Sequence, residues 1–198
     1  MTQEPFLHKI DNEQTAQLPA IEFRGEICII DREEQVEEAC RELAASPLIG
    51  FDTETRPSFK AGVTYRVSLL QLSTKNRCFL FRLNKIALSK PILKLLESSE
   101  IKKIGADVAG DLRSLRQLRH FRDGGFIDLQ NIAPEWGIEE KSLRKLSAIV
   151  LGRRVSKAQR LSNWEGSILT DKQQLYAATD AWVCIRIYEK LLHTPKTK

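Results

Sequence analysis

Two carboxylates stand two residues apart at the end of an apolar stretch of this chain. Asp52 and Glu54 close the segment 48–54, which otherwise reads as a buried strand. Side chains alternate between the faces of a strand, so both acids are expected on the same face. Buried without a partner, they would repel each other and lose hydration. A hard divalent cation would offset that cost, although two hydrated acids at a strand end give the same pattern.

A third carboxylate lies near the start of a predicted helix. Small residues lead from a short strand over 102–106 into a helix over 107–120. Asp107 is the expected N-cap of that helix. Asp111 falls in the first turns, where the helix dipole favours an ionised carboxylate. Stabilisation of the helix alone would explain Asp111. This acid therefore indicates a metal site only when it is considered together with the other acids.

A tyrosine and a fourth carboxylate share one face of the last predicted helix. Thr170 and Gln173 form a capping-box pattern that starts a helix over about 171–192. Tyr176 and Asp180 are four residues apart and therefore lie on the same face. The alanines between them allow another chain segment to approach closely. A half-buried tyrosine bonded to a surface acid would look the same.

Other catalytic patterns are absent from the sequence. There is no G-x-S-x-G, H-E-x-x-H, phosphate-binding P-loop or G-x-G-x-x-G motif. The four cysteines and three histidines show no zinc-like spacing. If the chain is an enzyme, carboxylates and metal ions must carry its chemistry.

The three acidic segments, in this order, resemble the DEDD superfamily of 3′→5′ exonucleases. The Tyr-x-x-x-Asp spacing resembles its DEDDy branch, which includes ribonuclease D and the Werner syndrome exonuclease. The matching positions are residues 51–57 with Gln71, then Lys103, Gly105 and Asp111, and finally residues 162–164 with Gln174, Tyr176 and Asp180. The resemblance covers about residues 26–193. Three motifs in order are far more specific than any one of them.

This resemblance implies a ribonuclease H-like α/β fold, in which helices flank both faces of a mixed sheet. It implies hydrolysis of phosphodiester bonds from a 3′ end with release of nucleoside monophosphates, using two Mg²⁺ or Mn²⁺ ions. In such a site Asp52 would bridge both ions, while Glu54 and Asp180 would complete the first ion's site. Asp111 would serve the second ion, and Tyr176 would orient the attacking water. Two cations about 3.5–4 Å apart can stabilise both the attacking and the leaving oxygen.

The hydrophobic pattern supplies the elements that must position these residues. Strands are also predicted over 27–30, 67–72 and 78–83, and further helices between Asp31 and Pro47 and over 91–98, with Asp31 as a possible cap. Strands followed by strand–helix alternation favour one mixed α/β sheet. We therefore predict a single exonuclease domain over residues 25–198, preceded by a flexible N-terminal arm over residues 1–24.

Composition limits the classes of protein that remain. Hydrophobic residues make up 42% of 198, which excludes a disordered chain. Basic residues exceed acidic ones by 31 − 26 = 5, a modest bias towards polyanions. No apolar run reaches the ~18–20 residues of a membrane helix, and the N-terminus lacks the pattern of a secretory signal. We expect a soluble cytoplasmic protein with no membrane partner.

Several residues near the motifs are predicted to contact substrate. Residues 141–164 hold seven basic residues and no acid, which favours phosphate contact over a hydrated helix face. Phe59 could stack on a terminal base, although packing explains it equally well, and Trp164 reads better as structural. The full set of candidate substrate contacts is Thr55, Phe59, Lys60, Arg153, Arg154, Lys157, Arg160, Asn163 and Trp164.

The predicted substrate is a nucleic acid with a free 3′ end. The resemblance to the Werner-type group favours DNA, with an exoribonuclease of the ribonuclease D type as the alternative. A non-catalytic nucleic-acid-binding protein on the same fold would usually have lost an acid, and none is lost here. An endonuclease on this fold would cut circular strands. A helicase or repair protein could act as partner, but the sequence identifies none.

Overall fold

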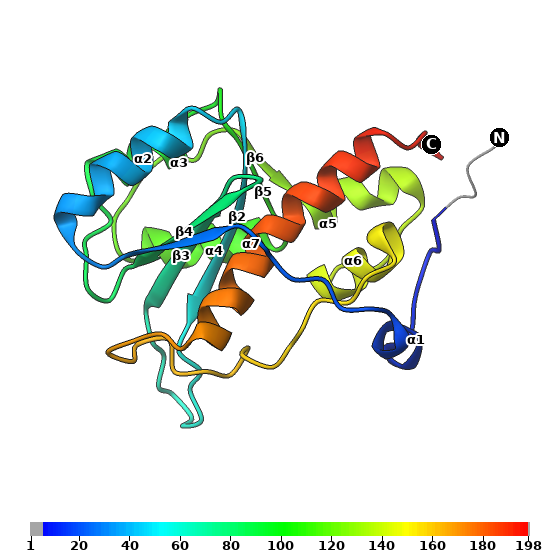
Figure 1. The fold of residues 1–198 in the computed structure, drawn as a ribbon, viewed down its shortest axis with the longest axis horizontal. Helices are drawn as coiled ribbons and strands as arrows, with labels where there is room; N and C mark the ends of the chain where they lie inside the picture. The colour runs from blue at the N-terminus through cyan, green and yellow to red at the C-terminus, as the bar shows by residue number, and fades with distance from the viewer. Residues whose placement is uncertain (1–5, 198) are drawn as a thin grey trace.

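The computed structural model describes residues 6–197, which form a mixed six-stranded sheet with helices on both faces (Figure 1). The strands lie in the order β1 (Glu26–Ile30), β4 (Arg77–Arg82), β3 (Val67–Ser73), β2 (Leu48–Thr55), β5 (Lys102–Gly105) and β6 (Phe126–Asp128). β3 pairs antiparallel with both β2 and β4, and the other neighbours are parallel. The predicted strands and the central place of β2 are confirmed.

Alternate residues of the strands bury against different helices. Leu70 of β3 packs in the cluster formed with α2 (Val36–Ala44), α3 (Lys90–Glu97) and α4 (Val108–Arg116). Its neighbour Leu69 packs instead with alanines of α7 (Asp171–Leu192). The remaining elements are α1 (Asn12–Gln17), η1 (Glu33–Gln35), α5 (Leu129–Ile132), η2 (Ala133–Trp136) and α6 (Leu143–Leu151).

Helix α7 lies unusually close to β2. A Cβ atom built on Gly50 would stand 1.9 Å from the Ala181 carbonyl oxygen, so only glycine fits there. The neighbouring Ala177 and Ala178 are fully buried. This close approach, allowed by small residues on both sides, brings the middle of α7 to the end of β2. The predicted capping box of Thr170 and Gln173 starts the helix.

The N-terminal segment, predicted as a flexible arm, contacts the rest of the domain in the part that the structure describes. Asp11 caps α1 in a capping box with Gln14. The Ile21 amide donates a hydrogen bond to the Arg154 carbonyl at 3.0 Å, and Phe23 is 4% exposed. The segment passes across α7 in Figure 1. Its few apolar residues are too irregularly spaced to show a period, yet they fill gaps beside α6 and α7; residues 1–5 lie outside the described range.

Two further details of the prediction are corrected. Asp31 does not cap α2, because the short helix η1 intervenes and the Asp31 carboxylate pairs with Lys85 at 3.2 Å. The helix predicted over 107–120 ends earlier, since α4 stops at Arg116. Both errors concern helix ends, where one turn of irregular backbone changes the geometry.

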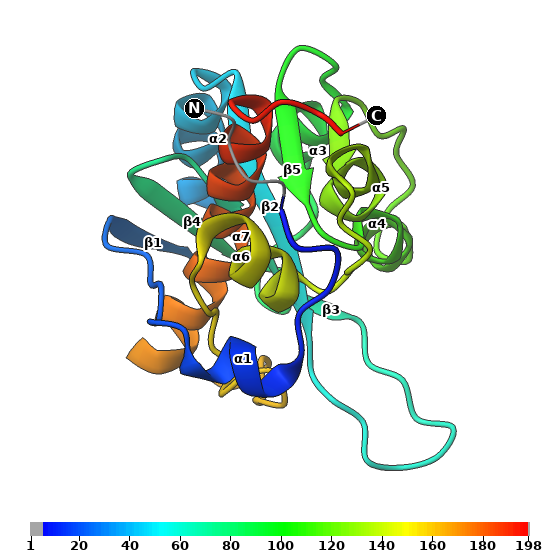
Figure 2. The same ribbon diagram turned by 90° about the vertical axis from the view of Figure 1, so that its right-hand side faces the viewer.

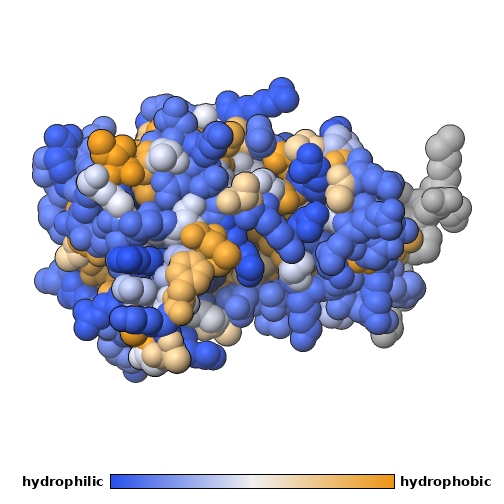
Figure 3. Space-filling view, turned by 90° about the horizontal axis from the view of Figure 1, so that it is seen from below, coloured by the Kyte–Doolittle hydropathy of each residue, from blue (hydrophilic) through white to orange (hydrophobic). Residues whose placement is uncertain are grey.

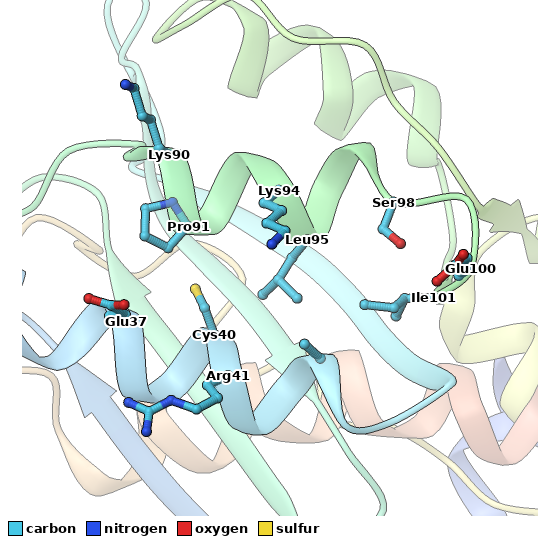
Figure 4. A pocket seen from close by; sticks show the side chains of 11 residues that line it. Glu37, Cys40, Arg41, Lys90, Pro91, Lys94, Leu95, Ser98, Glu100 and Ile101 are labelled. Carbon is cyan, nitrogen blue, oxygen red and sulfur yellow. The ribbon is translucent and has the colours of Figure 1, made fainter.

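The sheet face opposite α7 carries a groove between α2 and α3 (Figure 4). Its volume is about 640 Å³, and Cys40, Pro91, Leu95 and Ile101 form much of its lining. No helix among residues 6–197 is long and apolar enough to cross a membrane.

Candidate active site

Three of the four predicted acids meet where β2 ends beneath α7. Oxygen atoms of Asp52, Glu54 and Asp180 all lie within 4.8 Å of one another. Asp52 and Glu54 share a strand face as their spacing predicts, and the close approach of α7 supplies Asp180. Three carboxylates at such distances cannot all be ionised without a compensating cation.

The surroundings of the three acids disfavour negative charge. Burial, followed by the charge of Asp180, raises the pKa of Asp52 well above its usual value. Burial and the neighbouring acids raise the pKa of Glu54 to about 10. Burial raises the pKa of Asp180 to about 7, although an interaction with the Tyr176 hydroxyl opposes that shift. A bound cation would reverse this preference.

Three buried side chains at or beside this site have polar atoms without hydrogen-bond partners among the described residues. They are Asp180 with Oδ1, Gln71 with both atoms of its side-chain amide, and Trp164 with its ring nitrogen. Gln71 lies opposite Asp52 in the β2–β3 register, so its side chain leaves the same face of the sheet. Buried polar groups are nearly always paired. An unpaired carboxylate oxygen beside two further acids fits a hard cation such as Mg²⁺ or Mn²⁺, which prefers oxygen ligands.

Asp111 approaches this group from another direction. It is absent from the cluster of three, and its Oδ1 accepts a hydrogen bond of 2.6 Å from the Thr53 hydroxyl. Thr53 points to the strand face opposite Asp52, so Asp111 reaches the site around the end of β2. Burial and then the charge of Asp52 raise the pKa of Asp111 to about 8. The fourth acid therefore flanks the other three closely enough to interact electrostatically.

The turn before α4 differs from its predicted form. Asp107 occupies the N-cap position with a left-handed backbone, φ 65°, and its side chain caps nothing. The Asp128 carboxylate at the end of β6 instead accepts hydrogen bonds from the Asp107 and Val108 amides, at 3.3 and 2.9 Å. Asp128 therefore fixes the start of the helix that carries Asp111.

Tyr176 is held beside the acids by the segment that precedes α7. Its ring packs against Trp164 with 6.0 Å between centroids, and Trp164 is fully buried. Burial is the largest cause that raises the pKa of Tyr176 above its usual value. The tyrosine thus stays a neutral hydroxyl next to Asp180.

Polar contacts from β4, from the loop after β2 and from α7 fix the segment that carries Trp164. Arg82, 1% exposed on β4, donates a hydrogen bond to the Gly166 carbonyl. Arg56 pairs with Glu165 at 3.2 Å. The Gln173 side chain donates to the Asn163 carbonyl at 3.2 Å. The geometry leaves no surface of Trp164 for direct substrate contact, so its predicted contact is replaced by a packing role.

A comparison with known protein families decides what this arrangement is. Residues 27–194 match the family model described as 3′–5′ exonuclease. The chain belongs to the 3′–5′ exonuclease family. This membership confirms the predicted DEDDy relationship.

Two relatives agree with the family. The chain is 35% identical over 184 residues to the mouse bifunctional 3′–5′ exonuclease/ATP-dependent helicase WRN, covering 88% of this chain and 13% of that protein. It is 31% identical over 183 residues to the human exonuclease mut-7 homolog, covering 77% and 21%. The chain thus spans only a small part of these relatives.

Solved structures confirm the ribonuclease H-like fold. The Aedes aegypti Nibbler EXO domain superposes with a TM-score of 0.77 at 22% identity, covering 88% of this chain and 94% of that one. Escherichia coli RNase D gives a TM-score of 0.75 at 22% identity, covering 87% and 45%. At this identity the likeness concerns the fold alone.

The remaining predicted contact residues of this exonuclease-family chain lie around the site. Thr55 is half-buried at the end of β2, while Phe59 is 84% exposed and Lys60 is exposed on the β2–β3 loop, which extends away from the sheet in Figure 2. Arg153, Lys157 and Arg160 are exposed. Arg154 instead donates a hydrogen bond from Nε to the Leu18 carbonyl at 3.0 Å. The Arg154 side chain thus binds the N-terminal segment.

A pocket of about 340 Å³ lies between the β2–β3 loop and the segment before α7. Phe59, Lys60, Tyr65 and Asn163 contribute to its lining, and the Arg56 guanidinium lies 4.7 Å from the centre of the Tyr65 ring. Figure 3 shows hydrophobic residues gathered among hydrophilic ones on this lower face. The exposed large hydrophobic residues on the two segments are Phe59, Val63, Leu161 and Ile168.

Sequence reasoning did not assign roles to Thr53 or Gln71. Gln71 had a usable signal, because it is the one amide in the otherwise apolar and small-residue strand Val67–Ser73. Thr53 had none, since its partner Asp111 is 58 residues away and the alternation of the strand placed the two acids on the other face.

Proposed function

We propose that this chain is a metal-dependent 3′→5′ exonuclease that hydrolyses phosphodiester bonds at nucleic-acid 3′ ends and releases nucleoside monophosphates. Residues 25–198 would form its catalytic domain. The observation that carries the proposal is the group of Asp52, Glu54 and Asp180, with oxygens within 4.8 Å, in a chain whose family model is a 3′–5′ exonuclease.

The acids would hold two divalent cations, Mg²⁺ or Mn²⁺. Asp52, Glu54 and Asp180 would share the first, and Asp111 together with Asp52 would hold the second. Bound there, the cations would supply positive charge for the attacking and leaving oxygens of the phosphodiester. The four oxygen-donor side chains suit these metals, and the unpaired Oδ1 of Asp180 supports a cation at this point.

Other residues of the chain would orient the reacting groups. The neutral Tyr176 hydroxyl lies one helical turn from Asp180 and would hold the attacking water by a hydrogen bond. Trp164 would keep the tyrosine ring in place, since the two rings pack together. The Thr53 hydroxyl would fix one oxygen of Asp111 and leave the other for its metal.

The surfaces beside the acids would hold the strand. Phe59 would stack on an unpaired base, because its ring is exposed at the pocket between the two loops and stacking suits every base. Thr55, Lys60 and Asn163 would contact the terminal nucleotide. The exposed Arg153, Lys157 and Arg160 would neutralise phosphates.

DNA is the favoured substrate. The relatives above 25% identity include mouse WRN and, at 28% over 159 residues, the DNA polymerase I of Aquifex aeolicus. A Trypanosoma brucei RNase D solved with RNA U12 has a TM-score of 0.71 at 23% identity, so an exoribonuclease is the alternative. The mouse relative joins an exonuclease to a helicase in its name; a helicase or repair partner for this chain is part of the proposal.

The test uses 5′-labelled single-stranded DNA, 3′-recessed duplex DNA and matched RNA, each with Mg²⁺, Mn²⁺ or EDTA. We expect a ladder that shortens from the 3′ end only with metal, and is stronger on DNA. Asp52→Ala should abolish it, while Glu37→Gln in the distant α2–α3 groove should not. Binding without any ladder would favour a non-catalytic protein, and cutting of circular single strands would favour an endonuclease; either result contradicts the proposal.

A further inference from the structure

A second polar pocket lies beside α7, bordered by the N-terminal segment. Its volume is about 490 Å³, and three arginines from distant parts of the sequence line it: Arg24, Arg153 and Arg186. All three are exposed. Within residues 6–197 none of them forms an ion pair. Glu22 is the one acid that lines the pocket, so the arginines carry an excess of positive charge.

The frame of this arginine pocket is preformed. Phe23 packs against Trp182 of α7 with 5.8 Å between ring centroids, and its amide donates a 3.1 Å hydrogen bond to the Thr179 hydroxyl. The Arg186 guanidinium lies 5.5 Å from the centre of the Trp182 ring. A stacked guanidinium keeps its in-plane N–H groups available for an anion. The pocket is therefore suited to phosphate oxygens, which guanidinium groups bind by paired hydrogen bonds.

The arginine pocket adjoins the carboxylates. Ile21 and Glu22 line both this pocket and a neighbouring one of about 320 Å³ that includes Tyr176 and Asp180. Along α7, Asp180 and Arg186 are six residues apart, about 9 Å at 1.5 Å per residue. Phosphates of one strand follow one another by about 3.4 Å along a duplex axis. A strand with its 3′ end at the carboxylates thus carries phosphates within a few nucleotides that can reach the arginine pocket.

We propose that Arg24, Arg153 and Arg186 form a phosphate-binding site that holds the substrate strand upstream of the bond being cut. This inference rests on the proposed exonuclease function and adds a second contact to it. The N-terminal segment acquires a function, since it supplies Arg24 and encloses the pocket. Long strands should gain affinity from the site, whereas a dinucleotide should not reach it.

The test compares the wild-type chain with Arg24→Gln/Arg186→Gln, and with Arg41→Gln as a matched exposed arginine on α2. Fluorescence anisotropy measures the Kd for a 20-nucleotide single strand over a range of salt concentrations, and single-turnover assays measure cleavage of the 20-mer and of a dinucleotide. We expect the double variant to bind the 20-mer at least tenfold more weakly. The slope of log K against log salt should fall by about 1.4, at 0.7 for each lost contact. Dinucleotide cleavage and the melting temperature should stay unchanged, as should all values for Arg41→Gln.

If the double variant keeps the wild-type affinity and salt slope, the three arginines do not bind substrate phosphates. An equal loss on the 20-mer and the dinucleotide would also overturn the proposed phosphate-binding site, because it would indicate damage to the carboxylate site. Stronger competition by polyglutamate than by unlabelled DNA would assign the pocket to an acidic protein instead. The wild-type chain's cleavage of the dinucleotide tests the exonuclease function separately, so the two proposals can fail independently.

Discussion

The two sheet faces carry hollows of opposite character. The groove between α2 and α3 has about 640 Å³ and an apolar floor that includes Leu95 and the thiol of Cys40, whose pKa burial raises to about 12 (Figure 4). None of its lining side chains has a buried polar atom without a partner. Under α7 a smaller pocket of about 320 Å³ is lined by Tyr176 and Asp180. Asp180 and the nearby Gln71 both keep unpaired buried atoms there. Unpaired buried atoms among closely spaced carboxylates, more than the size of a hollow, therefore indicate where a cation belongs.

The largest effect should come from removing the central acid. Asp52→Asn should lower kcat by about 10³-fold or more. The variant weakens the binding of both cations, and the several kcal/mol by which they stabilise the transition state are then lost. Steady-state assays on single-stranded DNA with Mn²⁺ measure this. Glu100→Gln, an acid of the α2–α3 groove, is the matched control and should retain full activity. Equal losses in both variants would break the contrast between the two faces.

Tyr176→Phe should lower kcat by roughly 10²-fold, the lower end of what a positioned proton-handling group contributes. The melting temperature should change little, since the ring that packs against Trp164 remains. Single-turnover rates at saturating substrate give the measurement. A variant with wild-type kcat would show that the hydroxyl does not orient the water.

Gln71→Leu should separate metal binding from stability. Replacing an unpaired buried amide by an apolar side chain should leave the melting temperature of the metal-free protein unchanged or higher. When Mn²⁺ is bound, the Gln71 amide would donate a hydrogen bond to the Asp52 carboxylate. Its loss should lower the Mn²⁺ affinity about 10-fold. Calorimetric Mn²⁺ titration and thermal melts test both parts. Unchanged Mn²⁺ affinity would remove Gln71 from the site, and Cys40→Ala serves as the control from the other face.

Thr53→Val should have a smaller effect. It removes the hydroxyl that holds Asp111 at 2.6 Å, and such a hydrogen bond contributes about 1 kcal/mol, or roughly fivefold in rate. The loss should appear in kcat with KM nearly unchanged. A silent substitution would mean that α4 and Asp128 alone position Asp111.

The smallest effect concerns Lys103, a fully buried cation whose Nζ donates a hydrogen bond to the Ser98 carbonyl beside the groove. Burial lowers its pKa to about 8 from 10.5. The folded state therefore holds fewer protons than the unfolded state between these values, so stability rises with pH from about 8 to 10.5 by at most about 1.4 kcal/mol per unit. Below pH 8 the lysine is protonated in both states, so the full cost of burying its charge remains.

The check for Lys103 is denaturant unfolding of the wild-type chain and Lys103→Met from pH 7 to 10. The variant's advantage in unfolding free energy should be greatest at pH 7 and should shrink above pH 8. Exonuclease activity should not change, because this lysine lies on the groove side of the sheet. A constant difference across this range would contradict the lowered pKa.

Much of the fold and site follows from local sequence. Helix α7 has the predicted bounds, because its capping box and long apolar pattern are local signals. The shared face of Asp52 and Glu54 follows from strand alternation, and the shared face of Tyr176 and Asp180 from helical spacing. The alanines of α7 correctly indicate a close approach, although its partner, Gly50, does not emerge from periodicity.

The features that sequence reasoning missed depend on contacts between distant segments. Asp128 rather than Asp107 caps α4, because β6 ends beside that turn. Trp164 is buried since Arg82 on β4 and Arg56 in the loop after β2 fix its segment. The N-terminal segment contacts α6 and α7 through residues such as Ile21 and Phe23, whose spacing shows no period. Such contacts are set by the assembled sheet, which local patterns do not describe.

The most direct test of the carboxylate site is anomalous diffraction from crystals grown with Mn²⁺. Two peaks should appear at this site, one contacted by Asp52, Glu54 and Asp180 and the other by Asp52 and Asp111. Both should disappear in Asp52→Asn. Well-diffracting crystals with no Mn²⁺ peak at these carboxylates would contradict the proposed two-cation site.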